Sequence, residues 1–118
     1  MTKQEWFEVI KNHTVEAGTY QTFFEPVIDT LAGILEKRDL ALDVFEKTGG
    51  KVLVQHTNKA GVQNVEQNPS LRLVNDLNRD ALSYWRDLGL TPAGLRKLNA
   101  DVVTDKKAGS LEKLLAKL

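Results

Sequence analysis

The spacing of apolar residues predicts two helices in the first part of the chain. The first covers residues 3–16, places Trp6, Ile10 and His13 on one side, and ends at Gly18. The second covers residues 23–47, where apolar positions recur in alternating steps of four and three residues. This stripe comprises Phe24, Ile28, Leu31, Leu35, Leu42 and Phe45. Such a stripe needs a partner helix, from the same chain or from another copy.

Local signals mark both ends of the second helix. Thr22 and Glu25 have the spacing of a capping box, so we expect the Thr22 side chain to cap the first turn. Pro26 falls within that turn, where a missing backbone N–H group is tolerated. Gly49 and Gly50 are expected to end the helix.

The segment that follows changes to a period of two. Two short alternating stretches, 51–56 and 62–67, flank turn-forming residues from Asn58 to Gly61, which predicts a β-hairpin over residues 51–67. Because an isolated hairpin is only marginally stable in water, it must pack against the helices or against a neighbouring subunit.

A third helix has the clearest start. Asn68 suits the cap position and Pro69 the first helical position, so we predict a helix over residues 69–88, with Leu77, Tyr84 and Trp85 on its apolar side. Thr91 and Pro92 repeat this start and predict a short helix over residues 92–99. Residues 101–118 form a basic tail that we expect to be flexible, although leucines within 110–118 have the spacing of a further helix.

Together these elements predict a mainly α fold in a single domain of residues 1–100. The two long helices would form an antiparallel helical hairpin, with a short N-terminal helix beside it. A small β-hairpin would join the long helices, and a short helix would follow them.

Composition narrows the functional classes. The chain of 118 residues has no cysteine, which excludes disulfides, thiolate metal sites and cysteine catalysis. No apolar run approaches the roughly 20 residues that a membrane span needs, and no apolar signal core occurs near the start. Sixteen basic and sixteen acidic residues cancel, but residues 21–50 are acidic and residues 90–118 are basic. We therefore expect a partner other than a membrane.

Candidate catalytic or metal-binding groups do not form a pattern. His13 and His56 lack a second ligand at metal-binding spacing, and no phosphate-binding glycine loop or nucleophile motif is present. Asp29, Glu36 and Asp43 recur every seven residues along the second helix. A solvated acidic face is favoured over a charged contact with a partner. We predict no enzyme activity and no cofactor.

The late basic residues are candidates for nucleic-acid binding. Arg96, Lys97, Lys106 and Lys107 could neutralise phosphates without reading sequence, and a solvated tail is an equally weighted alternative. No helix-turn-helix pair is evident. We expect no DNA contact on the third helix, because its arginines are matched by aspartates: Arg72, Arg79 and Arg86 against Asp76, Asp80 and Asp87.

The order of these elements resembles one family of phage terminase small subunits. The resemblance covers Glu5 to Leu98 and rests on two motifs together, Asn-Pro-Ser-Leu-Arg at residues 68–72 and Leu-Gly-Leu-Thr-Pro at residues 88–92. Arg96 fits the arginine that usually follows the second motif. Gly94 departs from the alanine or serine expected there.

The resemblance implies a non-catalytic, ring-forming adaptor in the host cytoplasm. It would bind double-stranded viral DNA and present it to the large terminase subunit, whose ATPase and nuclease it would regulate. The DNA contacts would be the four late basic residues, and packing within and between subunits would use Phe24, Ile28, Leu31, Leu35, Leu42, Phe45, Leu77, Tyr84 and Trp85. The main alternative is a helical protein-interaction module that does not bind DNA, and a small metal-dependent enzyme is the poorest of the three interpretations.

Overall fold

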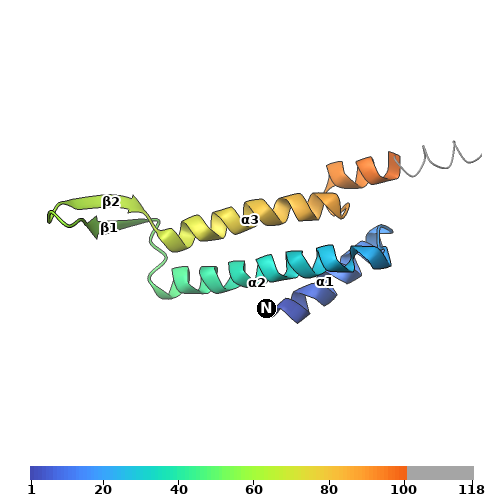
Figure 1. Cartoon of the computed structure of the whole chain (residues 1–118), viewed down its shortest axis with the longest axis horizontal. Coiled ribbons are helices and arrows are strands. Elements are labelled where there is room, and N and C mark those ends of the chain that lie inside the picture. The colour runs from blue at the N-terminus through green and yellow to red at the C-terminus, as the bar shows by residue number, and fades with distance from the viewer. Residues whose placement is uncertain (101–118) are drawn as a thin grey trace, which may run out of the picture.

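The computed structural model describes residues 1–100, and its helices run side by side (Figure 1). Helix α1 spans Lys3–Ala17, a 3-10 turn η1 spans Thr22–Phe24, and helix α2 spans Glu25–Lys47. Strands β1 (Leu53–Thr57) and β2 (Gln63–Gln67) lead into helix α3 (Pro69–Asp87), and residues 92–100 are helical. Helices α2 and α3 lie antiparallel, with α1 against α2. The predicted mainly α fold with an intervening β-hairpin is confirmed.

Most of the predicted helix ends are confirmed by their capping contacts. Gly18 follows α1 with φ of 74°, in the left-handed region that glycine adopts without strain. The Asn68 side chain accepts a hydrogen bond from the Ser70 N–H group and so caps α3. The Thr91 hydroxyl accepts from the Gly94 N–H group at 3.0 Å, which starts the last described helix as predicted.

The predicted capping box at Thr22 is wrong. Helix α2 begins only after the 3-10 turn, with Phe24 at the cap position and no side-chain cap. Glu25 instead accepts a hydrogen bond from the Tyr20 hydroxyl at 2.7 Å and pairs with Lys11 at 3.5 Å. The Glu25 carboxylate therefore stabilises the turn between α1 and α2 and does not cap the α2 backbone.

The core lies where the three long helices meet. Its buried members are Ile10, Ile28, Leu31, Ala32, Leu35, Ala81 and Leu88. On α1, Thr14 is buried and His13 is exposed, so the expected apolar side is shifted by one residue. The Thr14 hydroxyl donates to the Lys11 carbonyl, which allows this polar side chain to be buried.

The β-hairpin extends beyond the helices at one end of the molecule (Figure 1). Its strands pair antiparallel from Leu53 opposite Gln67 to Thr57 opposite Gln63. The apolar side chains of Val52, Leu53, Val62 and Val65 are all exposed. The hairpin therefore does not pack against the helices, contrary to one of the two expectations. Packing against a neighbouring subunit, the other expectation, stays a prediction.

The last described helix packs closely on the end of α3. A Cβ atom added at Gly94 would lie 2.9 Å from the carbonyl carbon of Arg86 and still nearer to its oxygen. Glycine in place of the expected alanine or serine thus permits this approach. The basic tail and its predicted helix, residues 101–118, lie outside the described residues.

Candidate assembly and nucleic-acid surfaces

Two of the three carboxylates that recur every seven residues on α2, Asp29 and Glu36, contact Lys3 at the start of α1. Lys3 Nζ lies 3.1 Å from Asp29, and the Lys3 N–H group donates to Glu36 at 2.7 Å. Glu36 thereby places a negative charge at the N-terminus of α1, where the helix dipole favours it. Asp29 and Asp43 are exposed, as expected for a solvated acidic face, and Asp43 pairs with Lys47 on its own helix at 2.7 Å. Glu36 is half-buried and departs from that expectation.

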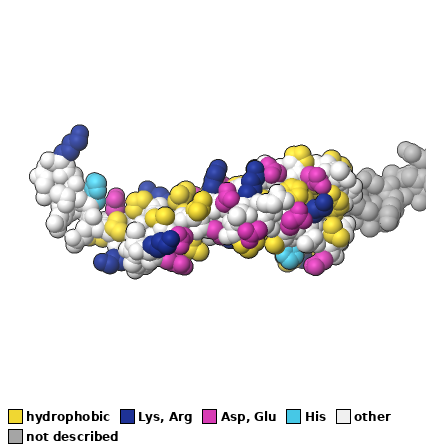
Figure 2. All heavy atoms as spheres, turned by 90° about the horizontal axis from the view of Figure 1, so that it is seen from below, with side chains coloured by type: hydrophobic (Ala, Val, Ile, Leu, Met, Phe, Trp, Pro, Cys, Tyr) yellow, Lys and Arg dark blue, Asp and Glu magenta, His cyan; other side chains and the backbone are white. Residues whose placement is uncertain are grey.

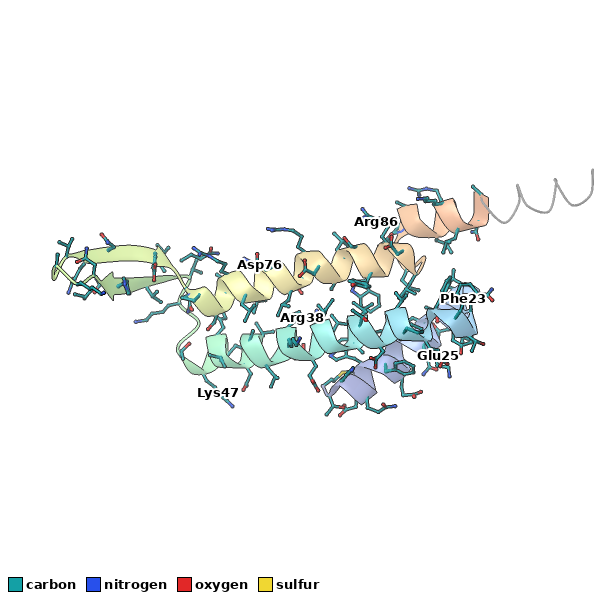
Figure 3. The ribbon with its side chains drawn as sticks, in the orientation of Figure 1. Phe23, Glu25, Arg38, Lys47, Asp76 and Arg86 are labelled. Carbon is teal, nitrogen blue, oxygen red and sulfur yellow. The ribbon has the colours of Figure 1, made fainter. Side chains whose placement is uncertain are left out.

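Asp39 on α2 forms hydrogen bonds both with Trp6 of α1 and with the neighbouring Arg38, the one polar residue at a stripe position of α2. It accepts hydrogen bonds from Trp6 Nε1 at 2.8 Å and from Arg38 at 3.0 Å. Partial burial raises the pKa of Asp39, but the bonds from Trp6, Arg38 and the Met1 amino group outweigh it, so the pKa lies below its ordinary value. Arg38 also stacks on the Trp6 ring at 5.4 Å and donates to Asn78 on α3. Figure 3 shows Arg38 between the two long helices.

Most of the residues predicted to pack within or between subunits are buried or half-buried within this single chain. Ile28, Leu31 and Leu35 are completely buried. Phe24, Tyr84 and Trp85 are half-buried against the same core. Phe45 and Leu77 are half-buried, and Leu42 is 37 % exposed. The apolar stripe of α2 therefore has its partner helices within this chain over its first four turns.

Other apolar side chains remain exposed along the two long helices. Leu40 and Val44 follow one another on α2 at a spacing of one turn, and Leu73 and Leu82 lie on α3. Figure 2 shows one face of the molecule, where hydrophobic side chains lie exposed between acidic and basic ones. Exposed apolar side chains of this kind are candidates for contacts with another protein. The sequence periodicity did not single them out, because it cannot show which side of a helix a neighbouring helix covers.

A second apolar surface lies at the opposite end from the hairpin. The Phe23 ring is 72 % exposed and meets the Phe24 ring edge-on, with the centroids 4.6 Å apart. Both rings border a depression of about 400 Å³ that Thr19 and Leu98 also line. Figure 3 shows Phe23 at this end of the helices.

The predicted DNA contacts lie on the helix over residues 92–100. Arg96 and Lys97 are both exposed and make no ion pair with residues 1–100. Lys97 borders a depression of about 430 Å³ together with Arg86 and Asp87. Arg86 and Lys97 are the basic residues of this depression, and the Asp87 carboxylate offsets part of their charge. Lys106 and Lys107 lie outside the described residues.

Within residues 1–100, no group of three or more histidine, aspartate or glutamate side chains is arranged to hold a metal ion. His13 pairs only with Glu16, at 3.7 Å, and His56 is exposed on β1. No helix in the same range is long and apolar enough to cross a membrane.

Fold and surfaces together define a class of protein: a helical hairpin with exposed apolar edges at its sides, a projecting β-hairpin, and basic residues at its C-terminal end. A family model described as phage terminase, small subunit, matches residues 2–104. The chain belongs to this family. No curated protein and no solved structure matched the chain.

Proposed function

We propose that the chain is a non-catalytic, ring-forming adaptor that acts in the host cytoplasm. It binds double-stranded viral DNA and presents it to the large terminase subunit, whose ATPase and nuclease it regulates. The observation that carries this proposal is family membership over residues 2–104, which gives the chain a role in phage DNA packaging.

Two surface features support assembly into a ring. Apolar side chains on α2 and α3 are exposed in a chain whose core is otherwise well filled. The β-hairpin also exposes its apolar side chains, although a two-stranded hairpin needs further packing to be stable. Contacts between copies would cover both sets.

The assembly is tested by light scattering on the purified full-length chain without DNA. We expect a single species whose mass is a fixed multiple of the 13.2 kDa chain and is maintained on dilution through the micromolar range. A strict monomer at high micromolar concentration would refute the ring.

The DNA contact is tested by the salt dependence of duplex binding. Each lost phosphate contact makes the slope of log affinity against log salt shallower by about 0.9, so Arg96→Ala/Lys97→Ala should reduce it by about 2. The control is Lys51→Ala/Lys59→Ala, which removes the same charge near the hairpin and should keep the full slope. Absence of duplex binding by the unchanged protein at low salt would favour the protein-interaction module instead.

The link to the packaging machinery is tested by capture. A tagged chain expressed in phage-infected cells should co-purify with a protein that hydrolyses ATP and cleaves DNA. Recovery of the chain without such a partner, while it still forms its ring, would refute the adaptor role alone.

A further inference from the structure

Helix α3 has two different edges beside the face that packs on α2. Val74, Ala81 and Leu88 are buried toward α2 at steps of seven residues. At about 100° per residue, Leu82, Arg79 and Arg86 fall to one side of this line and Leu73, Asp80 and Asp87 to the other. We call these two sets the basic edge and the acidic edge. Of the arginines and aspartates of α3, only Arg79 and Asp76 form an ion pair within residues 1–100.

Each edge carries one exposed leucine: Leu82 lies between Arg79 and Arg86, whereas Leu73 lies about two turns before Asp80. Leu82 on the basic edge is 57 % exposed, and Leu73 on the acidic edge is 49 % exposed. An apolar side chain bordered by charges of one sign is a typical element of a protein interface, with a dry centre and a charged rim. The two edges are thus opposite in charge, and each adds an exposed apolar side chain.

The charges on these edges are mostly unused within the described part of the chain. Arg79 pairs with Asp76 across the outer face of α3, at 3.7 Å and with both side chains largely exposed. Arg86, Asp80 and Asp87 make no ion pair with residues 1–100. Figure 3 shows Arg86 on the side of α3 away from α2. These groups are available to a partner that approaches α3 from the side.

We infer that the basic edge of one copy packs in parallel against the acidic edge of the next copy, with Arg79 beside Asp80 and Arg86 beside Asp87. This inference rests on the proposed ring and identifies the surface that builds it. Contact between two unlike edges leaves one edge of each kind free at the ends of a dimer, so further copies add until the ring closes. A two-fold dimer through α3 would place arginine on arginine, which like-charge repulsion disfavours.

The inference is tested by exchanging the charges of the edges. In Arg79→Glu/Arg86→Glu both edges are acidic, and in Asp80→Arg/Asp87→Arg both are basic. Each variant should require a protein concentration at least about tenfold higher for assembly, because every contact is repulsive. The quadruple variant has complementary edges again and should assemble as the unchanged protein does. In an equimolar mixture, each double variant should bind the other and not itself.

A matched control separates this effect from net charge. Lys37→Glu/Lys59→Glu changes the charge by the same amount as the basic-edge variant, at exposed residues that lie off α3, and its assembly should be unchanged. Circular dichroism establishes that each variant is folded. The inference is overturned if either double variant assembles normally, or if the folded quadruple variant stays monomeric. Failure of the unchanged protein to assemble would instead refute the proposed ring.

Discussion

Within residues 1–100, two glycines lie inside helices, and alanine is expected to have opposite effects at the two positions. At Gly33 in α2, an added Cβ atom would meet only the Lys3 side chain, at the ordinary contact distance of 3.8 Å. At Gly94, it would meet the backbone of Arg86, with the carbonyl carbon at 2.9 Å. A lysine side chain can move aside, whereas the carbonyl of Arg86 belongs to the last turn of α3 and is held there.

The magnitudes follow from two opposing effects. Alanine favours a helix interior over glycine by about 1 kcal/mol, and at Gly33 nothing opposes this gain. We therefore expect Gly33→Ala to raise the free energy of unfolding by about 0.5–1 kcal/mol. An overpacked contact costs about 1–3 kcal/mol, which exceeds the gain in helix propensity at Gly94. The net loss for Gly94→Ala is about 1–2 kcal/mol.

Chemical denaturation followed by tryptophan fluorescence measures both effects. Trp85 lies near the end of α3 and borders the same depression as Leu90, so it reports on the packing of this region. The unchanged protein and Gly33→Ala serve as references for the propensity effect. A Gly94→Ala protein as stable as Gly33→Ala would refute the close approach of the last helix to Arg86.

Three further changes test the polar and apolar contacts. Asp39→Asn should lower the free energy of unfolding by about 1–2 kcal/mol at pH 7, since it removes the charged acceptor of Arg38. Because the folded pKa of Asp39 is lowered, this contribution is present above the ordinary carboxyl pKa and is lost as pH falls through the folded value, so denaturation curves of the two proteins should converge in strong acid. Asn68→Ala should cost about 1–2 kcal/mol and speed hydrogen exchange at Ser70, whose N–H group it caps. Leu35→Ala should cost about 2–5 kcal/mol, whereas exposed Leu40→Ala should cost less than about 0.5 kcal/mol in the unassembled chain.

The sequence predicted the elements because their signals are local. Asn68 and Pro69 start α3, and Gly18 ends α1, through backbone geometry that a few neighbouring residues determine. The alternation in residues 51–67 likewise predicted the hairpin. The antiparallel arrangement followed because two long helices joined by a short segment have few other ways to bury their apolar sides.

The predictions were wrong where a side chain contacts residues that are distant in the sequence. Thr22 and Glu25 had the spacing of a capping box, but Tyr20 and Lys11 bind the Glu25 carboxylate. The sequence did not predict the contacts of Lys3 with Asp29 and Glu36, because residue spacing does not show where α1 begins relative to α2. The close approach at Gly94 depends on how two helices meet, which residue spacing alone cannot determine.

Most of the residues expected to pack between subunits belong to the apolar stripe of α2. The fold already buries much of this stripe within one chain. Ile28, Leu31 and Leu35 are already completely buried between α1 and α3, so they are not available to another folded copy. Assembly of folded chains must therefore use side chains outside the stripe. On α3, exposed Leu82 lies between Arg79 and Arg86, and exposed Leu73 precedes Asp80 and Asp87 on the other side, which gives each copy two unlike edges. A chain that closes its core on itself can in this way still carry the asymmetric contacts that a ring requires.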